Sequence, residues 1–421
     1  MVLALIYIAL NLLSPADIVP ALAPIRPLLT LALLSLPMAV LARMQAPEIG
    51  KLRTQVILVF LFFGFAISAW IPHRMYGANI ITLEDLAPNV LAYFLGIVFF
   101  RTPARLRLVR ALLVAIALFI LLNGLMQLPF AHVTKVSTPY VMVHADSIEY
   151  TEFRIRGLGM LQDPNTYGQY ILLVLPFLFV AKSDEGLGLL GWLAAVPITA
   201  VLILAVYLTG SRGALLGAAV LVGLFLVRKL KTTGAVLATL MGGLFLLAVN
   251  AYNSRTISIS SGMDRLSIWS TGMSYFKESP IWGIGPRNFG ARFGLTAHNS
   301  YLLVAAELGI IGYFLWMSMS VVTLLQLGKI AKLTDKIDSG LRRWAIALRI
   351  SLSGYLFTSF FLSRAYELPL YLLLGMCGGA IIAAGGDDAV PLRGTLWPVL
   401  SMGLCIGLLA LIYLMLRLRF V

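Results

Sequence analysis

Apolar stretches alternate with short polar segments along the whole chain. Most of them are long enough to cross the hydrocarbon core of a bilayer as helices, which satisfy their own backbone hydrogen bonds there. The pattern predicts an all-α, polytopic transmembrane helix bundle of about twelve spans, with residues 1–421 forming a single integral membrane domain. After a first stretch interrupted by prolines, the apolar stretches lie at about 27–42, 54–72, 88–100, 111–129, 168–181, 187–210, 214–227, 233–250, 299–327, 344–362, 369–385 and 396–416.

The distribution of basic residues predicts how this bundle is oriented in the membrane. These residues are dense in the short segments 43–53, 101–110 and 328–343, which the positive-inside rule places in the cytoplasm. The two long polar segments, 130–167 and 251–297, then both lie on the outer, periplasmic face. Threading the last stretch once puts Arg417 on that face as well, against the same rule. The paths of the first and last apolar stretches therefore stay open.

Composition supports a membrane protein. The chain is 60% hydrophobic and only 12% charged, whereas soluble domains carry about 25% charged residues. The net charge of +14 does not indicate nucleic-acid binding, because much of the excess lies in short loops that face membrane lipids. Cys377 and Cys405 both fall in apolar stretches and show neither a disulfide framework nor metal-ligand spacing. The N-terminus lacks a basic region and a cleavage site, so we expect a first membrane helix there.

The larger outer segment, 251–297, contains a predicted amphipathic helix at 262–277. Apolar residues recur there at intervals of three and four positions, and Trp269 suits a helix lying along the interface. A glycine-rich loop follows at 283–290. No strand precedes it, which excludes a nucleotide-binding fingerprint. We interpret the loop as a cover over the bundle, which either packs there or closes a cleft above a reacting headgroup.

His298 lies where this polar segment ends and a long apolar stretch begins. Asn299 or Ser300 can cap the helix that follows. Glu307 comes nine residues after His298, about 13 Å further along that helix. A carboxylate at that depth requires a partner or a function, and we expect it to bond to a neighbouring helix. For His298 an interfacial and a catalytic role are both open at this point.

Four arginines are expected on the same face as His298: Arg154, Arg156, Arg212 and Arg265. Arginines on the outer face run against the charge rule, so they favour an anionic ligand. No His, Cys, Asp or Glu cluster has metal spacing there, and guanidinium groups can bind phosphate oxygens without a metal. A sugar on a polyprenyl pyrophosphate needs such charge stabilisation and a base for the acceptor hydroxyl. Neighbouring arginines would keep His298 neutral, as a base must be.

Three segments resemble the O-antigen ligase/polymerase family of bacterial membrane proteins. Residues 154–165 resemble its Arg…Gly…Asn-Pro-Asn stretch, with Asp163 in place of the first Asn. Residues 208–214 resemble its Thr-x-Ser-Arg-Gly-Ala turn, which includes Ser211. Residues 298–312, from His-Asn-Ser-Tyr-Leu to Glu-Leu-Gly-Ile-Ile-Gly, resemble its most specific signature, and the resemblance covers roughly 150–320.

The resemblance implies a metal-independent, inverting glycosyltransferase of the C-type membrane class, with no cofactor and a periplasmic active site at the bacterial inner membrane. The donor would be O-antigen on undecaprenyl pyrophosphate and the acceptor lipid A–core oligosaccharide. By motif match His298 is the base, and Arg265 and Arg212 hold pyrophosphate, with Arg156 and Arg154 as further candidates. Asn299 and Tyr301 would orient His298 or the donor. Ser211, Glu307 and Trp269 would support the site.

Alternatives stay open within and outside the family. An O-antigen polymerase would use the same donor chemistry, and an O-oligosaccharyltransferase usually carries a long C-terminal extension that this chain lacks. Arg287 and Arg292 beside the glycine-rich loop favour a ligase if they bind core phosphates, although they could equally contact phospholipid. A non-enzymatic transporter of lipid-linked sugars would not need His298.

Overall fold

The computed structural model describes residues 1–19, 46–73, 76–145, 151–181, 186–227, 260–333 and 337–418, with a few single positions between 21 and 44 and between 230 and 233. The apolar stretches predicted at 27–42 and 233–250 lie almost entirely outside the described residues. So does the beginning of the larger outer segment, 251–259.

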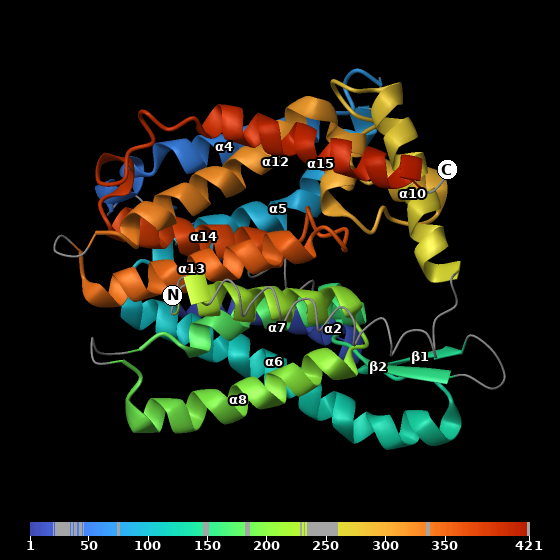
Figure 1. Ribbon diagram of the computed structural model, residues 1–421, viewed down its shortest axis with the longest axis horizontal. Coiled ribbons are helices and arrows are strands. Elements are labelled where there is room, and N and C mark those ends of the chain that lie inside the picture. Colours follow the sequence, from blue (N-terminus) through green and yellow to red (C-terminus); the bar gives the residue numbers. More distant parts are fainter. Residues whose placement is uncertain are drawn as a thin grey trace.

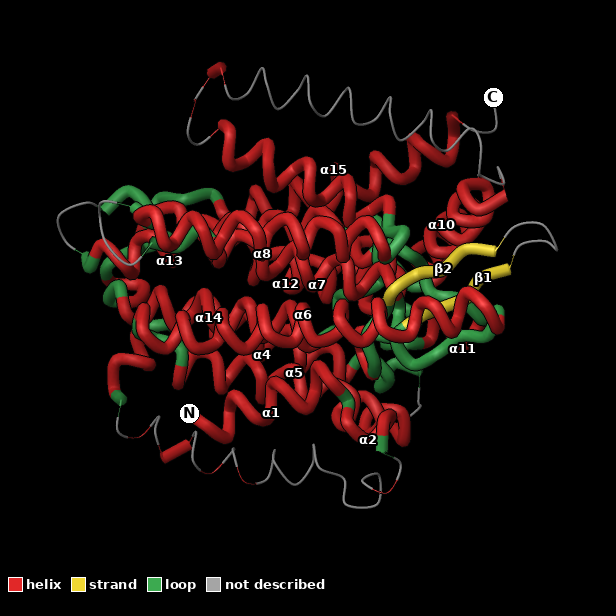
Figure 2. The backbone as a smooth tube through the Cα atoms, turned by 90° about the horizontal axis from the view of Figure 1, so that it is seen from below, coloured by secondary structure: helices red, strands yellow, loops and turns green. Residues whose placement is uncertain are grey.

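Most of the described helices run side by side along one common direction (Figures 1 and 2). They pack around a continuous apolar core. The described helices and strands are α1 (Val2–Leu13), α2 (Pro15–Ile18), η2 (Pro47–Lys51), α4 (Arg53–Ser68), α5 (Tyr76–Phe99), α6 (Pro103–Thr134), β1 (Val141–Ala145), β2 (Thr151–Ile155), η3 (Gly159–Leu161), α7 (Pro164–Leu178), α8 (Gly188–Leu208), an unlabelled helix Arg212–Val227, α10 (Ser260–Glu278), α11 (Asn288–Phe293), α12 (Ser300–Ile330), α13 (Ser339–Thr358), α14 (Leu368–Ala383), η4 (Gly386–Asp388) and α15 (Trp397–Leu418).

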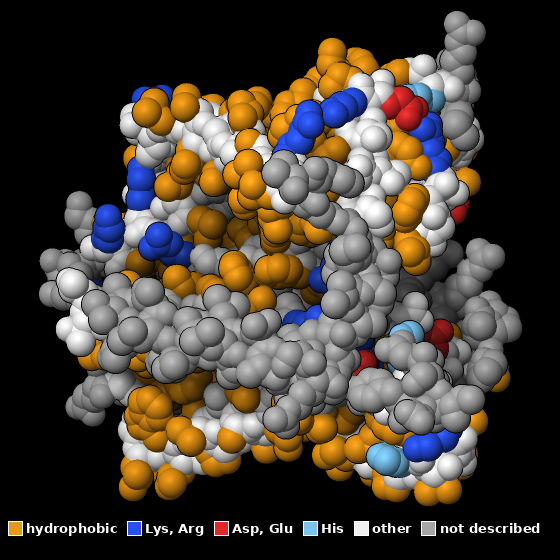
Figure 3. All heavy atoms as spheres, turned by 45° about the vertical axis from the view of Figure 1, so that its right-hand side comes forward, with side chains coloured by type: hydrophobic (Ala, Val, Ile, Leu, Met, Phe, Trp, Pro, Cys, Tyr) orange, Lys and Arg blue, Asp and Glu red, His pale blue; other side chains and the backbone are white. Residues whose placement is uncertain are grey.

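Five of these helices are long and apolar enough to cross a membrane: Gly77–Phe99, Pro103–Thr134, Gly188–Leu208, Ser300–Ile330 and Trp397–Leu418. Four shorter apolar helices accompany them within the described part of the chain. Large hydrophobic side chains are exposed on α8 and α15, and hydrophobic side chains cover much of the face seen in Figure 3. Because water would penalise such a surface, the structure is that of a helical membrane protein.

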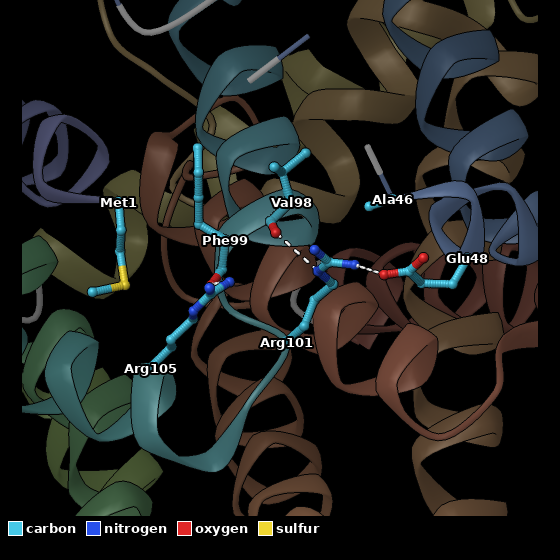
Figure 4. A pocket seen from close by; sticks show the side chains of 7 residues that line it. All are labelled: Met1, Ala46, Glu48, Val98, Phe99, Arg101 and Arg105. Atoms are coloured by element: carbon cyan, nitrogen blue, oxygen red, sulfur yellow. Dashed lines mark hydrogen bonds and ion pairs between the residues drawn. The ribbon is translucent and has the colours of Figure 1, made fainter. Parts of the chain in front are cut away.

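The two ends of the bundle differ. The strands β1 and β2 gather with α10 and α11 at one end, which we call the loop end (Figures 1 and 2). The opposite end carries η2 and η4 and a pocket of about 300 Å³ beside the Arg101–Glu48 ion pair (Figure 4). The predicted outer segments thus share one end and the predicted cytoplasmic segments the other.

The loop end contains a small sheet that an all-α fold does not include. β1 and β2 pair antiparallel, with Val141 opposite Ile155. β2 alternates polar and apolar residues as Thr-Glu-Phe-Arg-Ile, and β1 contains two valines, whose branched side chains favour strands. The mixed charge of this segment hid that pattern, and the all-α prediction was wrong here.

Helix boundaries correct two other predictions. α5 begins at Tyr76, so most of the interval between the predicted apolar stretches 54–72 and 88–100 is helical. α6 begins at Pro103, and the basic residues of the predicted loop 101–110 fall mostly within its first turns. Thr102 caps this helix, because its side chain accepts a hydrogen bond from the Arg105 amide at 3.3 Å. Charge marked the correct end of the bundle but not the limits of the helices.

The first and last apolar stretches both run the length of the bundle. Met1 lines the pocket at the η2 end, whereas Asp17 accepts a hydrogen bond from the Gly159 amide at 2.9 Å near the loop end. α15 reaches α10 with its final turns, so Arg417 lies at the loop end. Arg417 therefore lies at the end opposite to the basic segments 43–53 and 101–110.

α12 is broken at Gly309, about two and a half turns after its start at Ser300. Gly309 has φ 60° and ψ −166°, a conformation nearly restricted to glycine. The break frees backbone groups that pair with the glycine-rich loop: Ile310 N donates to Pro280 O at 2.8 Å, and Gly285 N donates to Glu307 O at 2.9 Å. The loop is thereby attached to the helix that begins beside His298. Its role as a cover stays a prediction.

Candidate active site at the loop end of the bundle

His298 occupies the residue before the cap of α12 and adopts a left-handed backbone with φ 50°. Such a conformation is uncommon for a residue other than glycine and persists only where neighbours impose it. Here Trp269 Nε1 donates to the Ala297 carbonyl at 3.0 Å, and the Ser300 amide donates to the Ser359 carbonyl at 2.8 Å. The backbone on both sides of His298 is therefore tied to α10 and α13.

Asn299 caps α12 and completes this support. Its Oδ1 accepts hydrogen bonds from the amides of Tyr301 at 3.0 Å and Leu302 at 3.1 Å. Its Nδ2 is buried and has no hydrogen-bond partner within the described structure. A buried donor without a partner is costly, so the cap that this side chain provides must offset that cost.

Arg265 projects from the first part of α10, one turn before Trp269, and is partly buried. Burial lowers the pKa of its guanidinium, and the positive charges of Arg212 and Arg154 lower it further, while Asp163 opposes them. Arg212 and Arg154 are therefore both close enough to Arg265 for their charges to act on it. Like charges gathered in this way disfavour the empty site and favour an anion.

A tight turn positions Arg212. Gly210 has φ 63°, and the Ser211 hydroxyl accepts a hydrogen bond from the Ala214 amide at 3.2 Å, which caps the helix Arg212–Val227. Arg212 is the first residue of that helix and is exposed. Its charge therefore projects from a helix N-terminus, where backbone amides also favour anions.

Arg154 connects the hairpin to this turn. Its Nε donates to the Thr209 carbonyl at 2.7 Å, and its Nη2 donates to Asn165 Oδ1 at 3.2 Å. The side chain is partly exposed, so part of the guanidinium stays accessible beside Arg265. Arg154 thus joins β2, α7 and the Thr209 turn around the cluster.

The environment of His298 favours the neutral imidazole. Burial lowers the pKa of His298 first, the charge of Arg265 lowers it further, and Arg364 adds to the effect. Asp163 acts in the opposite direction. The net shift is downward, so the ring is neutral near pH 7 and one of its nitrogens can accept a proton.

Asp163 and Arg364 form an ion pair that the sequence did not assign to the site. Arg364 Nη2 lies 2.6 Å from Asp163 Oδ2, and the Arg364 amide donates to Ser300 Oγ at 2.8 Å. Burial opposes the charge of Asp163, but Arg364 and hydrogen bonds from Asn165 outweigh it and hold the pKa of that carboxyl below its usual value. The pair lies beside His298. Arg364 lies between α13 and α14.

Two predicted site residues, Arg156 and Tyr301, make hydrogen bonds to backbone carbonyls and, among the described residues, do not contact the cluster around His298. Arg156 donates to the Thr138 carbonyl at 3.1 Å, and Tyr301 donates to the Leu356 carbonyl at 2.7 Å. Neither shows an interaction with Arg265 or His298 within the described structure.

Glu307 accepts a hydrogen bond from the Phe289 amide at 3.1 Å, which fastens α11 to α12. Glu307 thus bonds to a neighbouring helix, as expected, and that helix is the short α11 at the loop end.

The arginines beside the glycine-rich loop both have acidic partners. Arg287 Nε lies 3.0 Å from Asp85, and Arg292 Nη1 lies 2.7 Å from Glu278. Their charges are partly compensated, which weakens the argument that they bind core phosphates. Among the residues that the structure describes, no group of three or more His, Cys, Asp or Glu side chains could hold a metal ion.

Comparison with known proteins addresses the central part of this site. No curated protein matches the chain. Residues 197–317 match the family model described as O-antigen ligase. The matched segment contains Arg212, Arg265, His298 and Glu307, while Arg154, Asp163 and Arg364 lie outside it. Over residues 197–317 the chain carries the domain of the O-antigen ligase family, as its resemblance had indicated.

Proposed function

We propose that this protein is an O-antigen ligase of the bacterial inner membrane with its active site on the periplasmic face. It transfers the glycan from undecaprenyl pyrophosphate to lipid A–core oligosaccharide, without a metal and with inversion at the anomeric carbon. The observation that carries this proposal is a half-buried histidine, whose pKa is lowered by burial and by the charge of Arg265, at a structured end of a membrane helix bundle. The family match supports the reaction class.

His298 acts as the general base. Its neutral nitrogen takes the proton from the acceptor hydroxyl while that oxygen forms a bond to the anomeric carbon. The bond from this carbon to the pyrophosphate oxygen breaks on the opposite face, and the electron pair leaves with the pyrophosphate. A fixed base removes the need to deprotonate the hydroxyl beforehand, which contributes about 10²- to 10⁴-fold to such reactions.

Arg265 and Arg212 hold the pyrophosphate. Planar guanidinium groups bind phosphate oxygens with two hydrogen bonds and stay charged at neutral pH. As the glycosidic bond breaks, negative charge grows on the leaving oxygen, and preorganised cations stabilise it. Arg154 already donates to Thr209 and Asn165, so its main role is to position the wall of the site.

Reconstitution tests this function directly. Purified protein in nanodiscs is supplied with the polyprenyl-pyrophosphate-linked glycan and lipid A–core, without ATP. We expect a covalent glycolipid product and release of undecaprenyl pyrophosphate. Absence of a new glycosidic bond, with movement of the lipid-linked sugar across the membrane of sealed proteoliposomes, would instead identify a carrier of lipid-linked sugars.

The strain that lacks the gene separates ligase from polymerase. Loss of a ligase leaves lipid A–core without O-antigen, while long lipid-linked chains persist. Loss of a polymerase leaves core capped by a single repeat. We expect the first profile, and single-repeat caps would assign the protein as a polymerase.

A further inference from the structure

A second basic site lies at the loop end, away from the histidine cluster. A groove of about 230 Å³ separates the later turns of α10 from the last turns of α15. Lys277 and Arg417 line it from the two helices, and Met273 and Leu416 give it an apolar wall. The helices meet here although nothing in the proposed reaction at His298 requires these residues.

Both cations converge on one phenol ring. Lys277 Nζ lies 5.8 Å from the centre of the Tyr413 ring, and the Arg417 guanidinium lies 5.3 Å from it. Arg417 Nε also donates to the Tyr413 hydroxyl at 2.8 Å. Within the described part of the chain neither cation has a carboxylate partner, because the adjacent Glu278 binds Arg292. Two uncompensated charges that share a groove favour an anion between them.

The groove borders an exposed apolar face of α15. On α15 the side chains of Leu411, Leu414 and Leu418 are 45%, 53% and 68% exposed, which marks the lipid-facing side of this helix. Arg417 lies at the loop end against the positive-inside rule, so its position there has a reason other than topology. An anionic headgroup of the outer leaflet, with its acyl chains beside α15, provides that reason.

The position of the groove distinguishes two substrates. Arg265 and Lys277 are twelve residues apart on α10, which corresponds to about 18 Å along the helix. The pyrophosphate of the donor is bound at the Arg265 end, so the Lys277 end is free for a different phosphate. A bulky glycolipid whose phosphates lie well away from its reacting hydroxyl fits that separation. The Tyr413 ring offers an apolar face to a sugar.

We propose that the groove between α10 and α15 binds a phosphate group on the glycolipid acceptor. This inference rests on the proposed function, since it names the site that holds the second substrate of that reaction. Lys277 and Arg417 bind the phosphate, and α10 sets the distance from it to His298.

Binding is measured first, because it does not depend on catalysis. The full-length protein in phosphatidylcholine nanodiscs is titrated with phosphorylated lipid A–core, with the same glycolipid after removal of its phosphates, and with phosphatidylglycerol. The variant K277Q/R417Q is compared with K332Q/R393Q, which removes two exposed basic residues beyond α12 and before α15, at the other end of the bundle. We expect the phosphorylated glycolipid to bind at least about tenfold more tightly than its dephosphorylated form.

K277Q/R417Q should abolish that preference, and K332Q/R393Q should retain it. Equal binding of both glycolipids by the unmodified protein, or a preference that survives K277Q/R417Q, would overturn the proposal. Equal competition by phosphatidylglycerol would also overturn it and leave a general lipid site.

Kinetics provide the second measurement. K277Q/R417Q should raise the KM for the phosphorylated acceptor about tenfold, with kcat and the KM for the donor unchanged. A lower kcat with an unchanged acceptor KM would contradict an acceptor site. Absence of transfer by the unmodified protein would reject the proposed function, while the binding titration would still decide whether the groove recognises phosphate.

Discussion

Replacing Gly309 with alanine tests how the fold holds the site. A Cβ at this position would lie 2.3 Å from the Ile281 carbonyl oxygen, which belongs to the backbone and cannot rotate away. The conformation at φ 60° and ψ −166° costs a residue with a side chain about 1–3 kcal/mol. Displacing the Ile281 backbone costs about 1–3 kcal/mol more, as overpacking of well-packed sites does. Together Gly309→Ala should destabilise the junction of the loop and α12 by about 2–6 kcal/mol.

Gly290→Ala is the matched control, because Gly290 lies in the nearby α11 and a Cβ there meets no atom within 4 Å. Thermal unfolding in detergent should show a clearly lower Tm for Gly309→Ala and little change for Gly290→Ala. Limited proteolysis should cleave the 279–286 loop faster in the first variant only. If both variants melted and were cleaved alike, the tight junction between loop and helix would be refuted.

Three further predictions concern the chemistry. Arg265→Lys and Arg212→Lys should each lower kcat/KM about 10- to 100-fold, because one point charge replaces a planar fork, and EDTA should not inhibit; near-normal rates would remove the pyrophosphate role. The rate should rise with pH as His298 loses its proton, with a midpoint below the ordinary histidine value of about 6.5, since burial and Arg265 lower its pKa; a midpoint above that value would contradict a neutral base. Asp163→Asn should move this midpoint to still lower pH, because the carboxylate opposes the downward shift; an upward movement would show that Asp163 acts otherwise.

The helical bundle and the face that carries the site follow from simple signals. Apolar length predicts the helices, and the density of basic residues predicts which loops share an end. The same two signals, apolar length and basic-residue density, do not predict two features of the loop end. Two strands, β1 and β2, lie where the apolar pattern predicted none, and Arg417 lies at the end opposite to the basic segments 43–53 and 101–110.

The cluster at the site was predicted in part. His298, Arg265 and Arg212 stood out because the chain placed them on one face with an unusual sign of charge. Arg364 was not assigned to the site, although its guanidinium lies 3.5 Å from Glu367 and 2.6 Å from Asp163. Contacts such as this one depend on how α7 and α13 meet, which local sequence does not encode.

The break in α12 was not predictable from its apolar pattern. Gly309 reads as an ordinary small residue in a membrane helix, where glycine is frequent. Its conformation becomes necessary only when the 279–286 loop packs against the helix and takes the freed hydrogen bonds. Glu307 and the glycines on both sides of the junction are thus explained by one contact.

The most direct test of the central claim is the rate of His298→Ala, with His132→Ala as a control for loss of an exposed histidine on α6 at the same end of the bundle. Single-turnover transfer from a labelled donor is measured in nanodiscs, and donor binding is titrated separately. His298→Ala should fold and bind the donor normally and transfer about 10²- to 10⁴-fold more slowly, while His132→Ala should match the unmodified protein. Transfer by His298→Ala at a near-normal rate would contradict the assignment of His298 as the base.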